Sequence, residues 1–370
     1  HAAVNGLILS LDSKTIIDKQ CGVGFGEADS QAAWAAIAVK YKESHTIVIT
    51  GLSNVTSVEW DNPRNLLITG NGSIRKKNEA LSGHYSLGGS FSFINQQNVS
   101  VIGVGGLLTF DGNKVNQNSS TGMNFGLVFC LVSGDFRSQT GGDNKTQINA
   151  KVSNCEFINH GTVTPLSADN FGDGIFVVGC DGVEVHNNVF ENNERWGCVF
   201  SDVFNAKFYN NTCKNDNVST YGLGFLDVEN EGTDQINGSY SRGIKIYRNV
   251  GKGVCQIAVG SYVLPDNPTS LFHYMKDVEI YNNTLRLLDG VRVNLGIQIR
   301  GEEFINAING LIHENINIHS NTIRSLTGNH PWGIVAGVYG TPSVGSLFRH
   351  IYIENNKIIN CLGQIKLDSS

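Results

Sequence analysis

One short pattern recurs along this chain and constrains its fold more than any other feature. It reads apolar–x–apolar–x–Asn–Asn–x–apolar, with full copies at residues 183–190, 278–285 and 351–358. Near copies lie at residues 150–157, 206–213, 244–250 and 316–323, and weaker ones begin at Leu66 and Val99. The alternation predicts a strand with one buried face, and Asn suits the bend that follows it. Because one such strand cannot bury its face alone, the repeat indicates stacked coils, in which the Asn side chains can form a ladder.

A second family of apolar strands lies between the Asn copies. Its members cover residues 174–179, 197–202, 224–229, 255–260, 296–301, 333–338 and 363–368. The Asn copies that begin at Val183 and Ala206 are too close together for the four antiparallel strands of a propeller blade. The chain is therefore predicted to be all-β, a right-handed single-stranded parallel β-helix over residues 65–370, with two strand families per coil.

The N-terminal region, residues 1–64, shows a different pattern. A helix is predicted at about residues 29–42, with Asp29 or Ser30 as its N-cap. One face of this helix would carry the apolar side chains of Ala33, Trp34, Ile37 and Tyr41. We expect the helix to cover the open end of the solenoid, because an uncovered end exposes strand edges.

The composition narrows the possible classes of protein. Asp, Glu, Lys and Arg make up only 16% of the chain and 43 residues are glycine, which favours strands and tight turns over helix bundles. The net charge is −6 and no basic block occurs, so a nucleic-acid partner is not expected. No apolar run is long enough to span a bilayer, so membrane insertion is not expected either. The eight cysteines form no CxxC pair, which predicts buried thiols, folding in a reducing cytoplasm and no metal site.

Acidic residues gather in the second strand family. Alignment on the expected core residues places Val199 and Ser201 inward and Asp202 outward. In the next coil Asp227 and Glu229 point outward, so Asp202 and Glu229 are expected in one outward column, about 4.8 Å apart. Two carboxyl groups this close raise the pKa of one of them, which suits a general acid beside a base or nucleophile. Glycoside hydrolysis uses such a pair, and Asp173, one coil earlier, is the candidate for a wider pair with Asp227 or Glu229.

Other residues on the same face are candidates for substrate binding. Two coils after Asp227, the aligned strand places Gln298 and Arg300 outward. The full set of candidates for substrate contact is Arg300, Gln298, Arg195, Trp196 and Tyr262. Plainer interpretations stay open: the acids can be solvated outer-face residues, Arg195 can pair with a neighbouring glutamate, and Trp196 can pack in a turn.

The order of these parts resembles a known family. A Gly26–Ser30 stretch leads into the helix, the short strand Thr46–Ile49 follows, and an Asn-rich β-helix completes the chain. This order resembles the pectate-lyase-like superfamily and, within it, bacteriophage tailspikes and capsule depolymerases. The segments Asp173–Ile175 and Gly224–Glu229 are similar to runs in those proteins. The Pro-x-Gly-x-Tyr that often follows the helix is missing.

The resemblance implies a function and a setting. A tailspike-type depolymerase would bind and hydrolyse a bacterial surface polysaccharide without a cofactor, using Asp202, Asp227 and Glu229. It would be a homotrimer in the virion tail and act outside the host cell. One alternative is a polysaccharide lyase, in which Ca²⁺ or Arg300 would stabilise a uronate carboxylate. Another is a receptor-binding spike that grips a glycan without cutting it.

Overall fold

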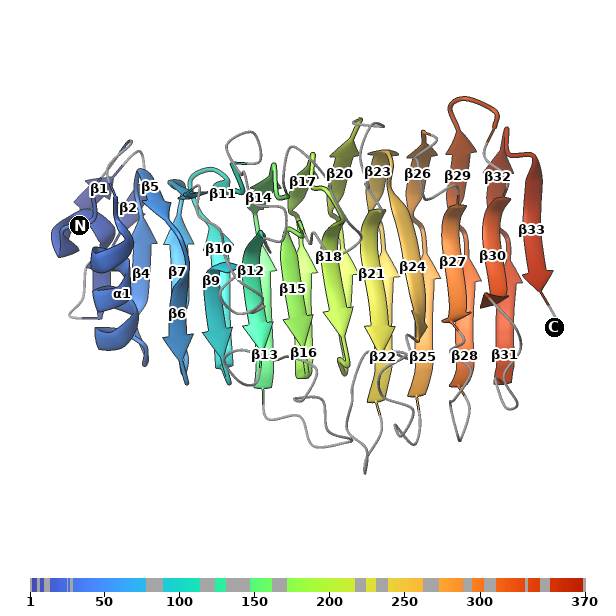
Figure 1. Ribbon diagram of the computed structural model, residues 1–370, viewed down its shortest axis with the longest axis horizontal. Coiled ribbons are helices and arrows are strands. Elements are labelled where there is room, and N and C mark those ends of the chain that lie inside the picture. The colour runs from blue at the N-terminus through green and yellow to red at the C-terminus, as the bar shows by residue number, and fades with distance from the viewer. Residues whose placement is uncertain are drawn as a thin grey trace.

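The protein is a long stack of parallel coils, with the N-terminus at one end of the stack and the C-terminus at the other (Figure 1). The computed structural model describes residues 2–4, 7–9, 14–24, 26, 29–77, 89–113, 124–130, 147–161, 172–216, 224–230, 239–261, 273–288, 295–302, 311–329, 332–339 and 347–368. Three parallel sheets run along the stack, and each complete coil contributes one strand to each sheet. The predicted parallel β-helix is therefore confirmed.

We number the sheets in the order in which the chain visits them within a coil. Sheet 1 consists of β3 (Thr15–Ile17), β4 (Thr46–Ile49), β7 (Leu67–Gly70), β10 (Gln97–Gly103), β13 (Gln147–Ser153), β16 (Cys180–His186), β19 (Lys207–Tyr209), β22 (Ser239–Tyr247), β25 (His273–Tyr281), β28 (Leu311–His319) and β31 (Leu347–Glu354). Sheet 2 consists of β5 (Leu52–Val55), β8 (Ser73–Lys76), β11 (Leu108–Asp111), β14 (Cys155–Ile158), β17 (Val189–Glu191), β20 (Thr212–Asn215), β23 (Val250–Gly253), β26 (Thr284–Leu287), β29 (Thr322–Ser325) and β32 (Lys357–Ile359).

Sheet 3 carries the second strand family. It consists of β6 (Val58–Asp61), β9 (Gly89–Ile94), β12 (Phe125–Cys130), β15 (Ile175–Val178), β18 (Trp196–Ser201), β21 (Gly224–Asn230), β24 (Gln256–Ser261), β27 (Leu295–Glu302), β30 (Trp332–Tyr339) and β33 (Gly363–Asp368). The expectation of two strands per coil was wrong, because the Asn pair bends the chain sharply enough to divide each copy between sheets 1 and 2. The solenoid also begins before the expected boundary at residue 65, because β4, β5 and β6 already belong to the three sheets.

The asparagine ladder lies at the turn between sheets 1 and 2. The first Asn of a pair adopts the left-handed conformation, as Asn187 and Asn210 do with φ of 57° and 53°. The second Asn is buried at positions 188, 211, 249, 283 and 321, and its side chain bonds the same position of the next coil. The Nδ2–Oδ1 distances for 188–211, 211–249, 249–283, 283–321 and 321–356 are 3.1, 3.2, 2.9, 2.9 and 2.9 Å. The ladder therefore fixes the coils in register while satisfying buried backbone groups.

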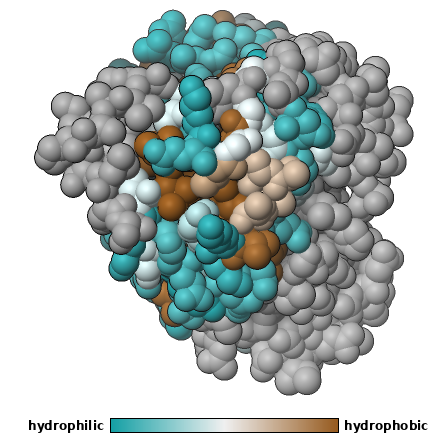
Figure 2. Space-filling model, turned by 90° about the vertical axis from the view of Figure 1, so that its left-hand side faces the viewer, coloured by the Kyte–Doolittle hydropathy of each residue, from teal (hydrophilic) through white to brown (hydrophobic). Residues whose placement is uncertain are grey.

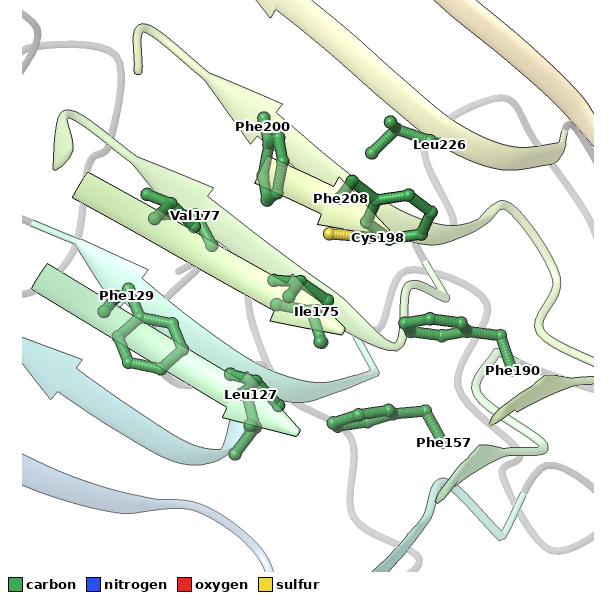
Figure 3. Packing of buried hydrophobic residues seen from close by; sticks show 14 of the residues in the cluster. Leu127, Phe129, Phe157, Ile175, Val177, Phe190, Cys198, Phe200, Phe208 and Leu226 are labelled. Carbon is green, nitrogen blue, oxygen red and sulfur yellow. The ribbon is translucent and has the colours of Figure 1, made fainter. Parts of the chain in front are cut away.

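Aromatic and aliphatic side chains fill the space between the sheets. Phe157 stacks on Phe110 and on Phe190, with ring centroids 5.3 Å apart in both pairs. Figure 3 shows Phe157 and Phe190 one above the other, with Leu127 and Ile175 of sheet 3 extending into the same core. The described residues include all eight cysteines, and none of these forms a disulfide.

An α-helix packs on the N-terminal end of the stack (Figure 1). The helix α1 (Gln31–Lys40) confirms the predicted element, and Asp29 accepts a hydrogen bond from the backbone N–H of Gln31 at 2.9 Å. Trp34, Ile37 and Ala38 are buried in the core, and the Trp34 ring lies 5.1 Å from that of Phe91. The outer side of α1 is also apolar and includes Val39, which is 77% exposed.

The remaining elements lie beside this helix. They are the 3-10 helix η1 (Asp18–Cys21) and the antiparallel pair β1 (Ala2–Val4) and β2 (Leu7–Leu9). In an end-on view from the N-terminal side, apolar residues gather near the centre of the face and polar residues surround them (Figure 2). No described helix has the length and apolar character needed to cross a membrane.

Candidate active site

The outer face of sheet 3 is buried over much of its length, which distinguishes it from an ordinary solvated sheet face. Every described side chain of β9, β12, β15, β18 and β21 is buried, although alternate residues point away from the core. The outward residues of the upstream strands form a second apolar cluster of their own. Its members include Ile94, Val128, Cys130, Phe176, Val178 and Val199. At β21 the outward residues change from apolar to acidic.

The register of β18 differs from the register predicted for residues 197–202. Phe200 pairs with Val228 and belongs to the core, whereas Val199 pairs with Asp227 and points outward. The prediction that Val199 and Ser201 point inward was therefore wrong by one residue. It failed because both faces of sheet 3 are apolar at this strand. The pattern of apolar residues therefore does not show which of two neighbouring side chains points into the core. Ser201, and not Asp202, shares the outward column with Glu229.

Asp202 lies just beyond the end of β18. Its backbone is in the left-handed conformation with φ of 53°, and its N–H donates to the carbonyl of Glu229 at 3.1 Å. The Ser201 hydroxyl lies 3.2 Å from a carboxyl oxygen of Asp202, and Asp202 is fully buried. Asp202 is therefore next to Glu229 at the end of the strand, but outside the column of Glu229.

Asp227 and Glu229 lie on the same outward face of β21, two residues apart and therefore about 6.6 Å apart between their Cα atoms. Both residues are almost fully buried, at 2% and 3% exposure. Ala258 and Gly260 occupy the same two columns on β24, and Gln298 and Arg300 occupy them on β27. We call Asp227, Glu229, Gln298 and Arg300 the acid–arginine cluster. Strand β24, whose two outward residues are small, therefore lies between the two acids on β21 and the arginine on β27.

Glycine at position 260 permits the main contact of this cluster. Nη2 of Arg300 donates to both carboxyl oxygens of Asp227, at 2.9 and 3.1 Å, so the arginine side chain reaches back across β24. A Cβ atom at Gly260 would lie 2.4 Å from Cγ of Arg300 and 2.2 Å from its carbonyl oxygen. A larger residue there would push the strand or the arginine away. The ion pair neutralises Asp227 where water has little access, since the side chains are 3% and 12% exposed.

Gln298 has a partner on the neighbouring strand. Its Oε1 accepts a hydrogen bond from Nε2 of Gln256 at 2.6 Å, and both residues are buried. The residue pattern did not predict Gln256 and Gly260 as part of the site. Aligning Ile257 and Val259 with Ile297 and Ile299 would have placed Gly260 beside Arg300, but the value of a glycine there becomes clear only from the path of the arginine.

Asp173 belongs to a different part of the face. Its carboxylate accepts bonds from Nε of Arg195 at 3.0 and 3.2 Å, from Nη2 of Arg195 at 2.6 Å, and from the backbone N–H of Trp196 at 2.9 Å. It aligns with Trp196 and Gly224 at the start of the strands, about 10 Å along the strand direction from Asp227. The structure thus separates Asp173 and Arg195 from the acid–arginine cluster.

Two aromatic candidates for substrate contact have different outcomes. Trp196 is 2% exposed and packs over Gly224, where a Cβ atom would lie 2.4 Å from its ring. Trp332 packs over Gly363 in the same way, which gives both tryptophans a role in stacking one coil on the next. Tyr262 lies outside the described residues.

Titratable groups also lie at the corner between sheets 2 and 3. His160 is fully buried, and burial lowers its pKa to about 4, although a hydrogen bond to Asn193 opposes the shift. Oδ1 of Asn193 lies 2.9 Å from Nδ1 of His160 and also accepts the backbone N–H of His160, so Nδ1 carries the imidazole proton. Within the described part of the chain, no group of three His, Cys, Asp or Glu residues is arranged to hold a metal ion.

Comparison with known proteins supports the fold. No protein-family model matches the chain, and a search of curated proteins found no match. Among solved structures, an exopolygalacturonase from Thermotoga maritima superposes with a TM-score of 0.56 at 9% identity, over 98% of this chain and 93% of that one. An endo-xylogalacturonan hydrolase from Aspergillus tubingensis gives 0.56 at 12% identity, over 95% of each chain.

The structure of a tailspike protein matches as well. The Dettilon tailspike protein superposes with a TM-score of 0.50 at 13% identity, over 96% of this chain and 69% of that one. At these identities the likeness establishes architecture alone. The chain has the right-handed parallel β-helix fold that its Asn repeat predicted.

Proposed function

We propose that this protein is a glycoside hydrolase that cleaves a polysaccharide at the outer face of sheet 3. One observation carries the proposal. Asp227 and Glu229 share the outward face of one strand, and Arg300 reaches past Gly260 of the intervening strand to bind Asp227. The similarity in fold to polysaccharide hydrolases and to a tailspike supports it as analogy.

The two carboxyl groups suit different roles. Arg300 stabilises the negative charge of Asp227, so we assign to Asp227 the base that takes a proton from the attacking water. Glu229 would donate its proton to the glycosidic oxygen, so that the bond from the anomeric carbon to the leaving sugar breaks as the bond to water forms. Hydrolysis with inversion would require the two carboxyl groups to be about 6.5–9.5 Å apart in the complex with the glycan, so that a water fits between them.

The setting in which this activity would operate is also a proposal. A tailspike-type depolymerase acting on a capsule or O-antigen, assembled as a homotrimer in a virion tail, would agree with the order of helix and β-helix. The substrate would then be a bacterial surface polysaccharide, and hydrolysis by two carboxyl groups would need no cofactor.

The direct test is a reducing-end assay on a panel of capsular and O-antigen polysaccharides, with the ultraviolet absorbance of unsaturated uronates followed in parallel. New reducing ends without absorbance are expected. Absorbance would indicate β-elimination instead, and binding without new ends would indicate a receptor-binding spike.

Substitutions then test the assigned residues. Glu229→Gln and Asp227→Asn should each lower kcat by about 10²–10⁴-fold, because each removes a proton-transferring group. Ser261→Ala, at the end of the neighbouring strand β24, serves as the control, and circular dichroism checks that every variant is folded. Full activity in both acid variants would exclude these residues as the acid and base.

A further inference from the structure

We infer that the acid–arginine cluster selects a glycan without a carboxylate on the sugars that flank the cleaved bond, a conclusion that rests on the proposed hydrolytic function. The solved structures with the same fold include enzymes named for galacturonan substrates, so this inference separates the present chain from them. It follows from how the charges of the cluster are already engaged.

The first consideration is the state of Arg300. Its guanidinium is the cation of the cluster, and Nη2 already binds both carboxyl oxygens of Asp227. A uronate carboxylate would have to compete with Asp227 for that guanidinium. If the uronate displaced Asp227 from Arg300, the Asp227 carboxylate would lose its counter-charge. The Asp227 side chain is only 3% exposed, so water could not compensate for that loss. Recruitment of Arg300 by the substrate would therefore oppose binding.

The second consideration is the charge around the pair. Glu229 follows Asp227 on the same face of β21, and Asp202 bonds the backbone of Glu229 from the preceding coil. Three acidic residues thus lie on the two adjacent coils of β18 and β21, and Arg300 is bound to one of them. A further carboxylate brought by a substrate would meet like charges where water screens them weakly.

The third consideration is the neutral polar chemistry beside the acids. Gln298 shares the outward column of Asp227, and Gln256 holds its amide through a 2.6 Å hydrogen bond. Ser201 occupies the column of Glu229 on the preceding strand. Amides and hydroxyls both donate and accept hydrogen bonds, as sugar hydroxyls do. These groups therefore suit a neutral sugar better than a uronate.

The test compares matched polymers. Acidic capsular polysaccharides are prepared in their native form and after chemical reduction of their uronates to the neutral sugars, and neutral O-antigens are included. We expect kcat/KM on the neutral form to exceed that on the native acidic form by about tenfold or more. Faster cleavage of the native acidic form would overturn this inference while leaving the hydrolytic function intact. No cleavage of any polymer would overturn the proposed function and this inference with it.

An added cation provides a second, independent readout. Gln298→Lys places a positive charge beside Arg300, and it should raise the relative rate on the acidic form compared with the neutral form. Val250→Lys adds the same charge at a 47% exposed position on sheet 2 and serves as the matched control, so it should leave the preference unchanged. An unchanged preference in Gln298→Lys, with folding confirmed by circular dichroism, would count against charge as the basis of selection.

Discussion

The outer faces of sheets 1 and 3 belong to the same coils and yet differ in almost every physical respect. On sheet 1, the ion pairs Lys207–Glu184 and Lys245–Glu279, at 2.8 and 2.9 Å, have side chains that are a third to a half exposed. On sheet 3, Arg195–Asp173 and Arg300–Asp227, at 2.6 and 2.9 Å, have side chains no more than 12% exposed. Pairs of similar length thus lie in media of very different polarity.

The aromatic residues show the same contrast. Sheet 1 carries a column of rings in which His186, Tyr209, Tyr247, Tyr281 and His319 stack at centroid distances of 4.7, 4.9, 5.0 and 5.2 Å. Because each ring covers the next, the column turns edges and not faces outward, so it offers no flat surface for a sugar. This difference is the reason why we place the proposed site on sheet 3, where outward charged side chains are buried.

The largest expected effect comes from breaking a buried pair on sheet 3. Asp173→Asn should lower the free energy of unfolding by about 3–5 kcal/mol, because it leaves the Arg195 guanidinium buried without its counter-charge. The matched change on sheet 1, Glu184→Gln, should cost less than about 1 kcal/mol. Urea unfolding of both variants measures the two values. Equal losses would remove the contrast between the faces.

A second expected effect depends on pH. Burial holds the pKa of His160 at about 4, whereas the same group in the unfolded chain titrates near 6.5. Between these values the unfolded chain binds more protons, so the free energy of unfolding should fall as the pH falls from about 6.5 to 4, by up to about 3 kcal/mol. Urea unfolding across this range should show the slope.

Two substitutions assign that slope. His160→Asn removes the titrating group and should remove the slope. His319→Asn changes a half-exposed histidine of the sheet 1 column and should retain it. Retention of the full slope in His160→Asn would show that another group is responsible.

The smallest expected effect concerns the ladder that carries both faces. Asn211 accepts bonds from the N–H and Nδ2 of Asn188 and donates to Val185 and Asn249, so Asn211→Ala should cost about 2 kcal/mol. Its exposed neighbour Asn210 has φ of 53°, a conformation that glycine adopts readily. Asn210→Gly should therefore change the free energy of unfolding by only about a few tenths of a kcal/mol. Thermal unfolding of the two variants compares them. A similar loss in both would show that the turn, and not the ladder, is what matters.

The fold was predictable because its signal is local and repeated. Each Asn pair marks a bend, and the residues around it alternate in a way that only a stacked strand explains. The helix α1 was predictable for the same reason, since Trp34 and Ile37 share one face and are buried. The division of each copy into two strands was not predictable, because the residue pattern marks a bend at the Asn pair but does not give the angle of that bend.

The site was predictable only in its residue types. Asp227, Glu229, Gln298 and Arg300 were placed on the correct face, since Leu226, Val228, Ile297 and Ile299 are unambiguous core residues. Asp202 was misplaced because Val199 and Phe200 are both apolar, and only the register shows which one belongs to the core. The contact of Arg300 with Asp227 crosses an intervening coil, so no pattern within a single strand reveals it.

The invariant length of one corner has an evolutionary consequence. From β16 onward, the turn between sheets 1 and 2 always has two residues, as at 187–188, 210–211 and 355–356, because the ladder accepts nothing longer. The corners on either side of sheet 3 vary widely, from the single residue between β15 and β16 to residues 131–146 between β12 and β13. Insertions and deletions can therefore accumulate along both borders of sheet 3 without disturbing the stacking. Such a scaffold can acquire a new specificity at that face while its asparagine ladder stays under separate selection.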